Sequence, residues 1–150
     1  MALIEEINRA IADSMKAKDP ARLAPLRMLK AALMNREVER GRALDEAESL
    51  QVVSSLVKQR RDSIEQFTNG GRKDLADKEA AEITVLEAYL PPAVDAAVLE
   101  QTVADAIAEV GATSPKDMGK GMKAAMARLS GQTVDGKVVN EIVRRKLAGT

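Results

Sequence analysis

Apolar residues in this chain recur every three or four positions, and they nowhere alternate one by one with polar residues as in a strand. This spacing places side chains on one face of an α-helix, which turns once every 3.6 residues. The segment that follows Asp45 shows the pattern over five positions, Leu50, Val53, Val57, Ile64 and Phe67. The sequence therefore predicts an all-α protein.

Seven helices are expected from this spacing and from the residues that cap helix ends. Four of them precede residue 91 and cover about residues 3–17, 20–41, 45–69 and 72–90. Three shorter helices follow, and they begin at Asp95, Ser114 and Asp135. Asp and Ser favour these positions because their side-chain oxygens accept hydrogen bonds from free N–H groups of the first turn. Asp45 and Glu48 have the spacing of a capping box.

Pro91 and Pro92 form the strongest break in the chain. Two adjacent prolines cannot continue a helix, because each lacks the N–H group and its ring clashes with the preceding turn. We therefore place a domain boundary here, between an N-terminal four-helix domain, residues 1–90, and a C-terminal three-helix domain, residues 91–150. A unit of about 60 residues is only marginally stable alone, so the second domain is expected to rest on the first or on a partner.

The composition excludes many catalytic and metal sites, since the 150 residues include no histidine and no cysteine. Without these residues there is no disulfide, no imidazole base, no thiolate nucleophile, and no zinc or iron–sulfur site of the usual kind. The acidic residues show no calcium-loop spacing either. We expect no metal, no cofactor and no catalytic residue.

Phe67 and Tyr89 are the only aromatic residues, too few to form a platform on which unpaired bases stack. The chain starts with acidic residues where a secretory signal has basic ones, and no apolar run approaches the roughly 20 residues that span a bilayer. These features predict a soluble cytoplasmic protein.

Charge is unevenly distributed, although 23 basic and 23 acidic residues balance over the whole chain. From Gly111 to the end, eight basic residues face three acidic ones. Such an excess favours a polyanionic partner, for which the alternative is an ordinary solvated helix surface. The candidate RNA-binding residues are Lys116, Lys120, Lys123, Lys137, Arg144, Arg145 and Lys146.

Two patterns in the same region have both a functional and a structural interpretation. Gly119-Lys120-Gly121 is similar to part of a phosphate-binding loop, but the earlier glycine and the following Ser or Thr are missing. We favour two glycines that allow close helix packing. Met118, Met122 and Met126 could form an adaptable partner groove, although their spacing fits one buried helix face better.

Arg60 lies between Val57 and Ile64 on the apolar side of the third expected helix. It either faces a ligand or is partly buried beside a carboxylate such as Glu79 or Glu82. We favour the ion pair, because a buried arginine without a partner costs several kcal/mol.

Several long motifs resemble the YqeY family. They are KQRRDSIEQF at residues 58–67, GRKDL at 71–75, LEAYLP at 86–91, DMGKGM at 117–122 and DGKVVN at 135–140. That family is similar to the C-terminal helical and tail region of GatB, one component of the tRNA-dependent amidotransferase. This enzyme converts Glu-tRNA or Asp-tRNA into the amide-carrying forms, and its tail region helps to hold the tRNA.

The resemblance implies a two-part helical fold and a role directed at tRNA, without the catalytic domain of GatB. We therefore expect a non-catalytic tRNA-binding accessory module. The alternative is a protein–protein adaptor that docks on a larger assembly. A carbon–nitrogen ligase or amidotransferase activity is a distant third, since only the family name implies it.

Overall fold

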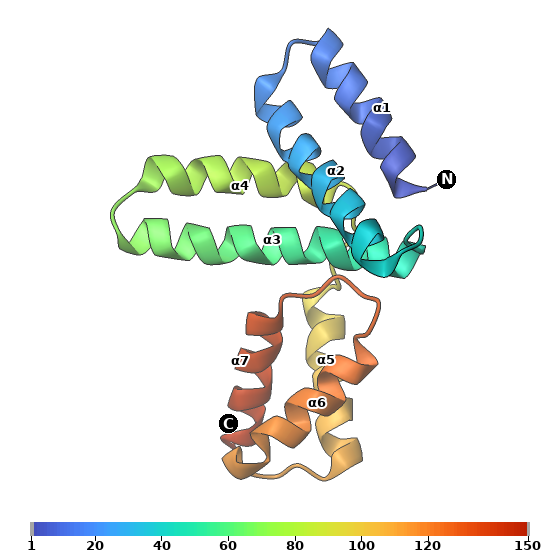
Figure 1. Ribbon diagram of the computed structural model, residues 1–150. Coiled ribbons are helices and arrows are strands. Elements are labelled where there is room, and N and C mark those ends of the chain that lie inside the picture. The colour runs from blue at the N-terminus through green and yellow to red at the C-terminus, as the bar shows by residue number, and fades with distance from the viewer. Residues whose placement is uncertain (1, 150) are drawn as a thin grey trace. The chain divides into compact units, whose positions relative to one another are not determined.

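The computed structural model describes residues 2–149, and this part of the chain contains seven α-helices and one short 3₁₀ turn, η1 (Figure 1). The elements are α1 (Leu3–Lys16), α2 (Pro20–Arg40), α3 (Glu46–Asn69), α4 (Lys73–Glu87), α5 (Ala96–Val110), η1 (Pro115–Asp117), α6 (Met118–Arg128) and α7 (Gly136–Leu147). An isolated bridge between Ala93 and Thr133 is the only extended pairing among the described residues. The prediction of an all-α protein is confirmed.

The chain divides into two compact units, Met1–Leu90 and Pro91–Thr150, which we call the N-terminal unit and the C-terminal unit. The division falls at the diproline. Whether each unit is a domain that folds by itself stays a prediction.

Aspartates cap four of the helices, and three of them, Asp45, Asp95 and Asp135, are at the helix starts that the sequence predicts. The Asp45 carboxylate accepts a hydrogen bond of 2.8 Å from the Glu48 N–H, and the Glu48 side chain accepts one of 3.3 Å from the Asp45 N–H, so the capping box is confirmed. Asp19, Asp95 and Asp135 cap α2, α5 and α7. Ser114 is different, because its side chain makes no cap hydrogen bond. Instead the Asp117 carboxylate accepts the Thr113 N–H at 2.9 Å.

Two helical hairpins make up the N-terminal unit. α1 packs on α2, α3 lies alongside α4, and α2 contacts both α3 and α4 (Figure 1). Their shared core contains Ile7, Leu29, Leu33, Val53, Val57 and Leu86. α4 ends at Glu87 rather than at residue 90. The Tyr89 and Leu90 N–H groups donate to the Leu86 and Glu87 carbonyls, three residues back instead of four, so the last turn before Pro91 is no longer α-helical.

Arg60 is buried inside the N-terminal unit, with 5% of its side chain exposed. Its Nε lies 3.9 Å from a Glu82 carboxylate oxygen, and its Nη1 donates a hydrogen bond of 3.2 Å to the Leu56 carbonyl. The prediction that Arg60 pairs with a carboxylate from a neighbouring helix is confirmed. Neutralising this guanidinium inside the unit offsets the cost of burying it.

Three helices form the C-terminal unit, around a core that includes Val103, Ala125, Leu129, Val139 and Val143. Gly121 allows α6 to approach its neighbours: a Cβ placed there would lie 3.3 Å from Val143 Cγ1 and 3.6 Å from Leu147 Cδ1. At Gly119 a Cβ would meet nothing within 4 Å. The packing interpretation is therefore right for Gly121 and wrong for Gly119. The expected inward position of Met126 is also wrong, since this side chain is 39% exposed, whereas Met118 and Met122 pack against the core.

Glu48 has a second role besides capping α3. Its carboxylate also holds two arginines, one at the end of α2 and one in the segment between α2 and α3. Its carboxylate lies 2.7 Å from Arg42 Nη1 and 3.4 Å from Arg40 Nε. The hydrogen bond from Arg42 is the main reason that the pKa of Glu48 falls from 4.5 to about 2. A lowered pKa means that this carboxylate stabilises the fold above about pH 4.5, and that its contribution is lost as the pH falls towards about 2.

We expect Arg42→Ala to raise the pKa of Glu48 towards its ordinary value of 4.5, although Arg40 keeps part of the effect. Carboxyl NMR shifts followed through an acid titration measure this change. Arg36→Ala is the control, because Arg36 contacts Glu39 instead, at 3.5 Å. An unchanged Glu48 titration in Arg42→Ala would contradict the assignment.

Candidate nucleic-acid interface

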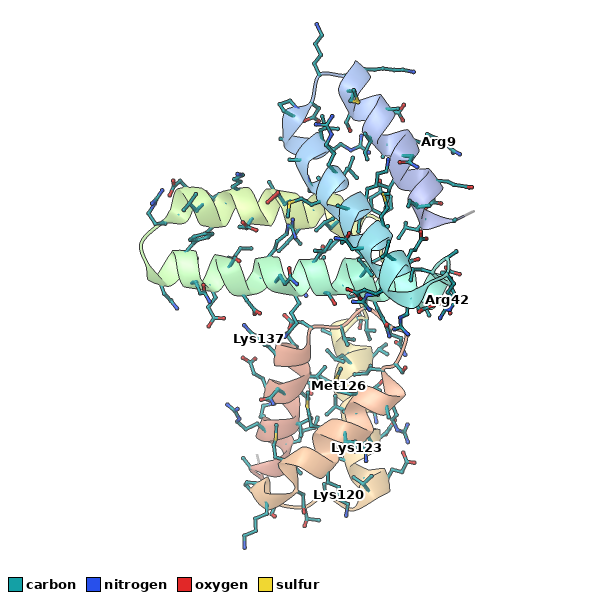
Figure 2. The ribbon with its side chains drawn as sticks, viewed as in Figure 1. Arg9, Arg42, Lys120, Lys123, Met126 and Lys137 are labelled. Atoms are coloured by element: carbon teal, nitrogen blue, oxygen red, sulfur yellow. The ribbon has the colours of Figure 1, made fainter. Side chains whose placement is uncertain are left out.

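The seven candidate RNA-binding residues all lie in the C-terminal unit. Lys116 belongs to η1, Lys120 and Lys123 belong to α6, and the others belong to α7; Figure 2 labels Lys120, Lys123 and Lys137. All are exposed except Lys146, which is half-buried. The structure therefore leaves most of these charged groups accessible to solvent.

Lys116, Lys120 and Lys123 follow one another at intervals of four and three residues. This spacing places Lys120 and Lys123 on one side of α6, with Lys116 just before it. No carboxylate of residues 2–149 lies within 4.0 Å of any of these three ammonium groups. Asp117 is the nearest acid in sequence, and its pKa is lowered chiefly by the hydrogen bond from the Thr113 N–H, with a smaller effect of Lys120. None of these three ammonium groups therefore forms an ion pair within the described part of the chain, although Lys120 is near enough to Asp117 to affect its pKa.

The basic residues of α7 are in a different environment. Lys146 Nζ lies 3.3 Å from a carboxylate oxygen of Glu100 on α5, and Arg145 binds the same carboxylate. The hydrogen bond from Arg145 is the largest cause of the lowered pKa of Glu100. Arg144 instead donates a hydrogen bond of 3.2 Å to the Asn140 side chain, which carries no charge.

Sequence reasoning missed the acidic residues of α5, because the count began at Gly111. Over residues 91–150 there are eight basic and seven acidic residues, an excess of one. Arg128 is partly neutralised in the same way as Arg145 and Lys146, since it lies 2.6 Å from Glu109. Counting the acidic and basic residues over the whole expected domain shows that they nearly balance. Only the packing of α5 shows which individual charges are paired.

Lys116, Lys120 and Arg144 lie at the same end of the C-terminal unit, and Lys123 lies about one turn further along α6. A Cβ at Gly121, in the first half of α6, would meet Val143 and Leu147, so the start of α6 lies beside the last turns of α7. This contact places Arg144 at the same end as Lys116 and Lys120, whereas Lys137 is in the first turn of α7. We call Lys116, Lys120, Lys123 and Arg144 the basic end.

The part of the chain that the structure describes holds neither a metal-binding cluster of acidic residues nor a membrane-spanning helix. Within residues 2–149, no three acidic side chains converge to hold a metal ion. The helices over the same residues include none long and apolar enough to cross a membrane.

Several known proteins with similar sequences have the word mitochondrial in their names. Altered inheritance of mitochondria protein 41, mitochondrial, from Lachancea thermotolerans is 30% identical over 115 residues, which are 75% of this chain and 62% of that protein. The proteins of the same name from Eremothecium gossypii and Kluyveromyces lactis are 34% and 36% identical over 88 and 87 residues. These two matches cover 58% and 57% of this chain and 48% and 47% of those proteins. The chain thus spans about half to three-fifths of the length of these relatives.

A family model for Yqey-like proteins matches residues 4–147, nearly the whole chain. The motifs at residues 58–67 and 117–122 lie within this range. The predicted resemblance is confirmed, and the chain belongs to the YqeY-like family.

Proposed function

We propose that this protein is an accessory module that binds tRNA through the basic end of its C-terminal unit. The observation that supports this proposal most directly is the row of three lysines, Lys116, Lys120 and Lys123, without a carboxylate within 4.0 Å in the described part of the chain. Ammonium groups in this arrangement neutralise backbone phosphates and release the counterions that surround them.

The chemistry of the C-terminal unit favours recognition of RNA shape rather than of unpaired bases. Both aromatic residues of the chain, Phe67 and Tyr89, belong to residues 1–90, so residues 91–150 cannot stack bases on aromatic rings. Double-stranded RNA is recognised largely through its phosphates and 2′-hydroxyl groups. The paired helical stems of tRNA present both groups.

The number of unpaired cations sets the expected strength of the salt effect. If the four residues of the basic end each neutralise one phosphate, tRNA affinity should fall roughly 10²-fold between about 50 and 200 mM salt. If all seven candidate residues each neutralised a phosphate, tRNA affinity would fall more steeply with salt concentration. We expect four phosphate contacts rather than seven, because among the other candidates Arg145 and Lys146 already bind Glu100.

A fluorescence titration against total tRNA at two salt concentrations tests the proposal. We expect Lys116→Ala/Lys120→Ala/Lys123→Ala to bind at least tenfold more weakly at low salt, and its logarithmic salt slope to fall by roughly 3, because three phosphate contacts are lost. The matched control is Arg61→Ala/Arg72→Ala/Lys73→Ala. It removes three positive charges that already lie 3.0, 3.0 and 2.7 Å from carboxylates of the N-terminal unit. Equal binding by the two triple variants would contradict the proposal.

A protein–protein adaptor is the second candidate function. Met126 and Val138 are 39% and 42% exposed on α6 and α7, and a protein partner that contacts these helices would cover both side chains. If the chain binds no tRNA at low salt, this candidate becomes the better explanation.

The location of the protein is also a proposal. The names of the relatives include the word mitochondrial, whereas the sequence alone predicts a cytoplasmic protein. We propose a mitochondrial location, on the strength of the relatives' names. Imaging of a C-terminally tagged chain separates the two locations.

A further inference from the structure

The side of α2 that faces solvent is apolar over about four turns. Its exposed apolar residues recur at intervals of three and four, which place them on one face of the helix; they are Ala24, Met28, Ala31, Met34 and Val38. Met28, Met34 and Val38 are 51%, 48% and 81% exposed. Arg27 and Asn35 are the only polar residues on this face. Single exposed apolar residues are normal at a surface, whereas a contiguous row of them marks a contact site.

This face is turned away from the rest of the N-terminal unit. α2 packs on α1, α3 and α4 through its other side, where Leu26, Leu29 and Leu33 are buried. The exposed row therefore adds nothing to the core. We call it the α2 face.

Basic residues gather beside the α2 face, around the turn that joins α1 to α2 (Figure 1). Residues 9–30 include six basic and two acidic residues, whereas the whole N-terminal unit has fifteen basic and sixteen acidic residues. One of the two acids, Asp19, caps α2. Positive charge is therefore concentrated in one hairpin of a unit that is slightly acidic overall.

Four of these cations have no close acidic partner, since no carboxylate of residues 2–149 lies within 4.0 Å of their nitrogens; they are Lys16, Lys18, Arg27 and Lys30. Arg27, Lys30 and Met34 follow one another at intervals of three and four, so cations border the α2 face directly. Arg22 is in a different environment, because it lies beside the Tyr89 phenol. Glu39, the acid at the far end of the face, contacts Arg36 at 3.5 Å.

Exposed apolar side chains beside unpaired cations are complementary to an anionic bilayer. The cations neutralise lipid headgroups, and the apolar side of a helix that lies in the interface reaches the boundary of the acyl chains. Methionine side chains adapt to such a surface, and long lysine side chains keep their charge at headgroup level. RNA would neutralise the cations, but it would leave Met34 and Val38 in water.

An acidic protein helix could also cover both kinds of side chain, but it fits the cations less well. Carboxylates of the N-terminal unit contact arginines such as Arg42 and Arg61, whose planar groups match a carboxylate in a fixed position. Three of the four unpaired cations are instead lysines, which act as point charges without a preferred geometry. Mobile lipid headgroups require no such geometry.

We propose that the α2 face, with Lys16, Lys18, Arg27 and Lys30, docks on an anionic phospholipid bilayer. α2 lies in the plane of the membrane surface in this arrangement and does not span the bilayer.

Co-sedimentation of the full chain with lipid vesicles tests the proposal. One set of vesicles contains equal parts of phosphatidylcholine and phosphatidylglycerol, and the other contains phosphatidylcholine alone. We expect the chain to bind the mixed vesicles and not the neutral ones. Binding to the mixed vesicles should weaken as the salt concentration rises, because salt screens the attraction between the cations and the headgroups.

A triple lysine variant tests the cations. Lys16→Gln/Lys18→Gln/Lys30→Gln should bind the mixed vesicles on the order of 100-fold more weakly, because each cation near an anionic surface contributes about fivefold. The matched control is Lys58→Gln/Lys73→Gln/Lys78→Gln. It removes three lysines from α3 and α4 of the same unit, and it should bind as the parent does.

A second pair of variants tests the apolar row. Met34→Ser/Val38→Ser should weaken binding to the mixed vesicles at least about tenfold, because it removes apolar area that the bilayer would cover. Met126→Ser/Val138→Ser is the matched control, since it replaces the same two residue types at exposed positions of α6 and α7. Circular dichroism of each variant shows whether the helices are retained.

The proposal is wrong if the chain does not bind the mixed vesicles at low salt, or if either variant binds them like its matched control. If the triple lysine variant instead loses tRNA affinity and the parent binds no vesicles, the cations contact RNA and the membrane proposal is wrong. Lys116→Ala/Lys120→Ala/Lys123→Ala should keep its vesicle binding; a loss would assign the lipid contact to the basic end. The two proposals concern different units, so either can fail without the other.

Discussion

Leu129→Ala is expected to destabilise the C-terminal unit by about 3 kcal/mol, with little effect on α1–α4. Leu129 is 2% exposed and packs in the core of α5, α6 and α7. Its truncation removes buried methyl groups and leaves a cavity among side chains that cannot close around it. A unit of about 60 residues has a total stability of only about 3–9 kcal/mol, so the loss is a large part of the whole.

Native-state hydrogen exchange measures this effect helix by helix. Amide protons of α5–α7 should exchange faster in Leu129→Ala, while those of α1–α4 should keep their protection. Leu86→Ala provides the reciprocal control, because Leu86 is fully buried in the core of the N-terminal unit. If both variants accelerate exchange equally in all seven helices, the chain unfolds as one cooperative body and the prediction of two domains is wrong.

Gly121→Leu and Gly119→Leu should change stability in opposite directions, although the two sites are two residues apart in α6. At Gly121 the first added carbon would already lie 3.3 Å from Val143 Cγ1 and 3.6 Å from Ile107 Cγ1. A leucine there must push α6 away from α5 and α7, and such overpacking costs about 1–3 kcal/mol. At Gly119 the added carbon would meet nothing within 4 Å. Leucine there should stabilise the helix by up to about 0.5–1 kcal/mol, since glycine is a poor helix former.

Urea denaturation of the two variants and the parent gives the comparison. The midpoint should fall for Gly121→Leu and rise for Gly119→Leu. Equal losses at both positions would show that Gly119 is also held in a close contact. The Gly119→Leu variant also tests whether RNA approaches this part of α6. If it is fully folded but binds tRNA more weakly, RNA contacts the exposed backbone at Gly119.

Much of the fold follows from local patterns in the sequence. The intervals of three and four apolar residues predict the helices, and Asp45 with Glu48 predicts the start of α3 to the residue, because capping depends only on groups within one turn. Pro91 and Pro92 predict the break between the units for the same reason. Family membership also follows from the sequence, since the motifs at residues 58–67 and 117–122 are long and ordered.

The candidate site could be predicted only in part. Lysines at intervals of four and three in Lys116, Lys120 and Lys123 mark one side of a helix without any knowledge of its neighbours. The partners of Arg145 and Lys146 could not be predicted in this way. They bind Glu100, which lies 45 residues before Arg145 and comes close only when α5 packs on α7.

The sequence by itself therefore determined the helices, their caps, the break at the diproline and the family. Only the tertiary structure decided which charges are neutralised, which of two neighbouring glycines is in close contact, and that Met34 and Val38 are exposed on α2. The physical reason is the range of the interactions. Helix formation and capping act between residues less than two turns apart, whereas ion pairs, close packing and burial depend on side chains that distant parts of the chain bring together.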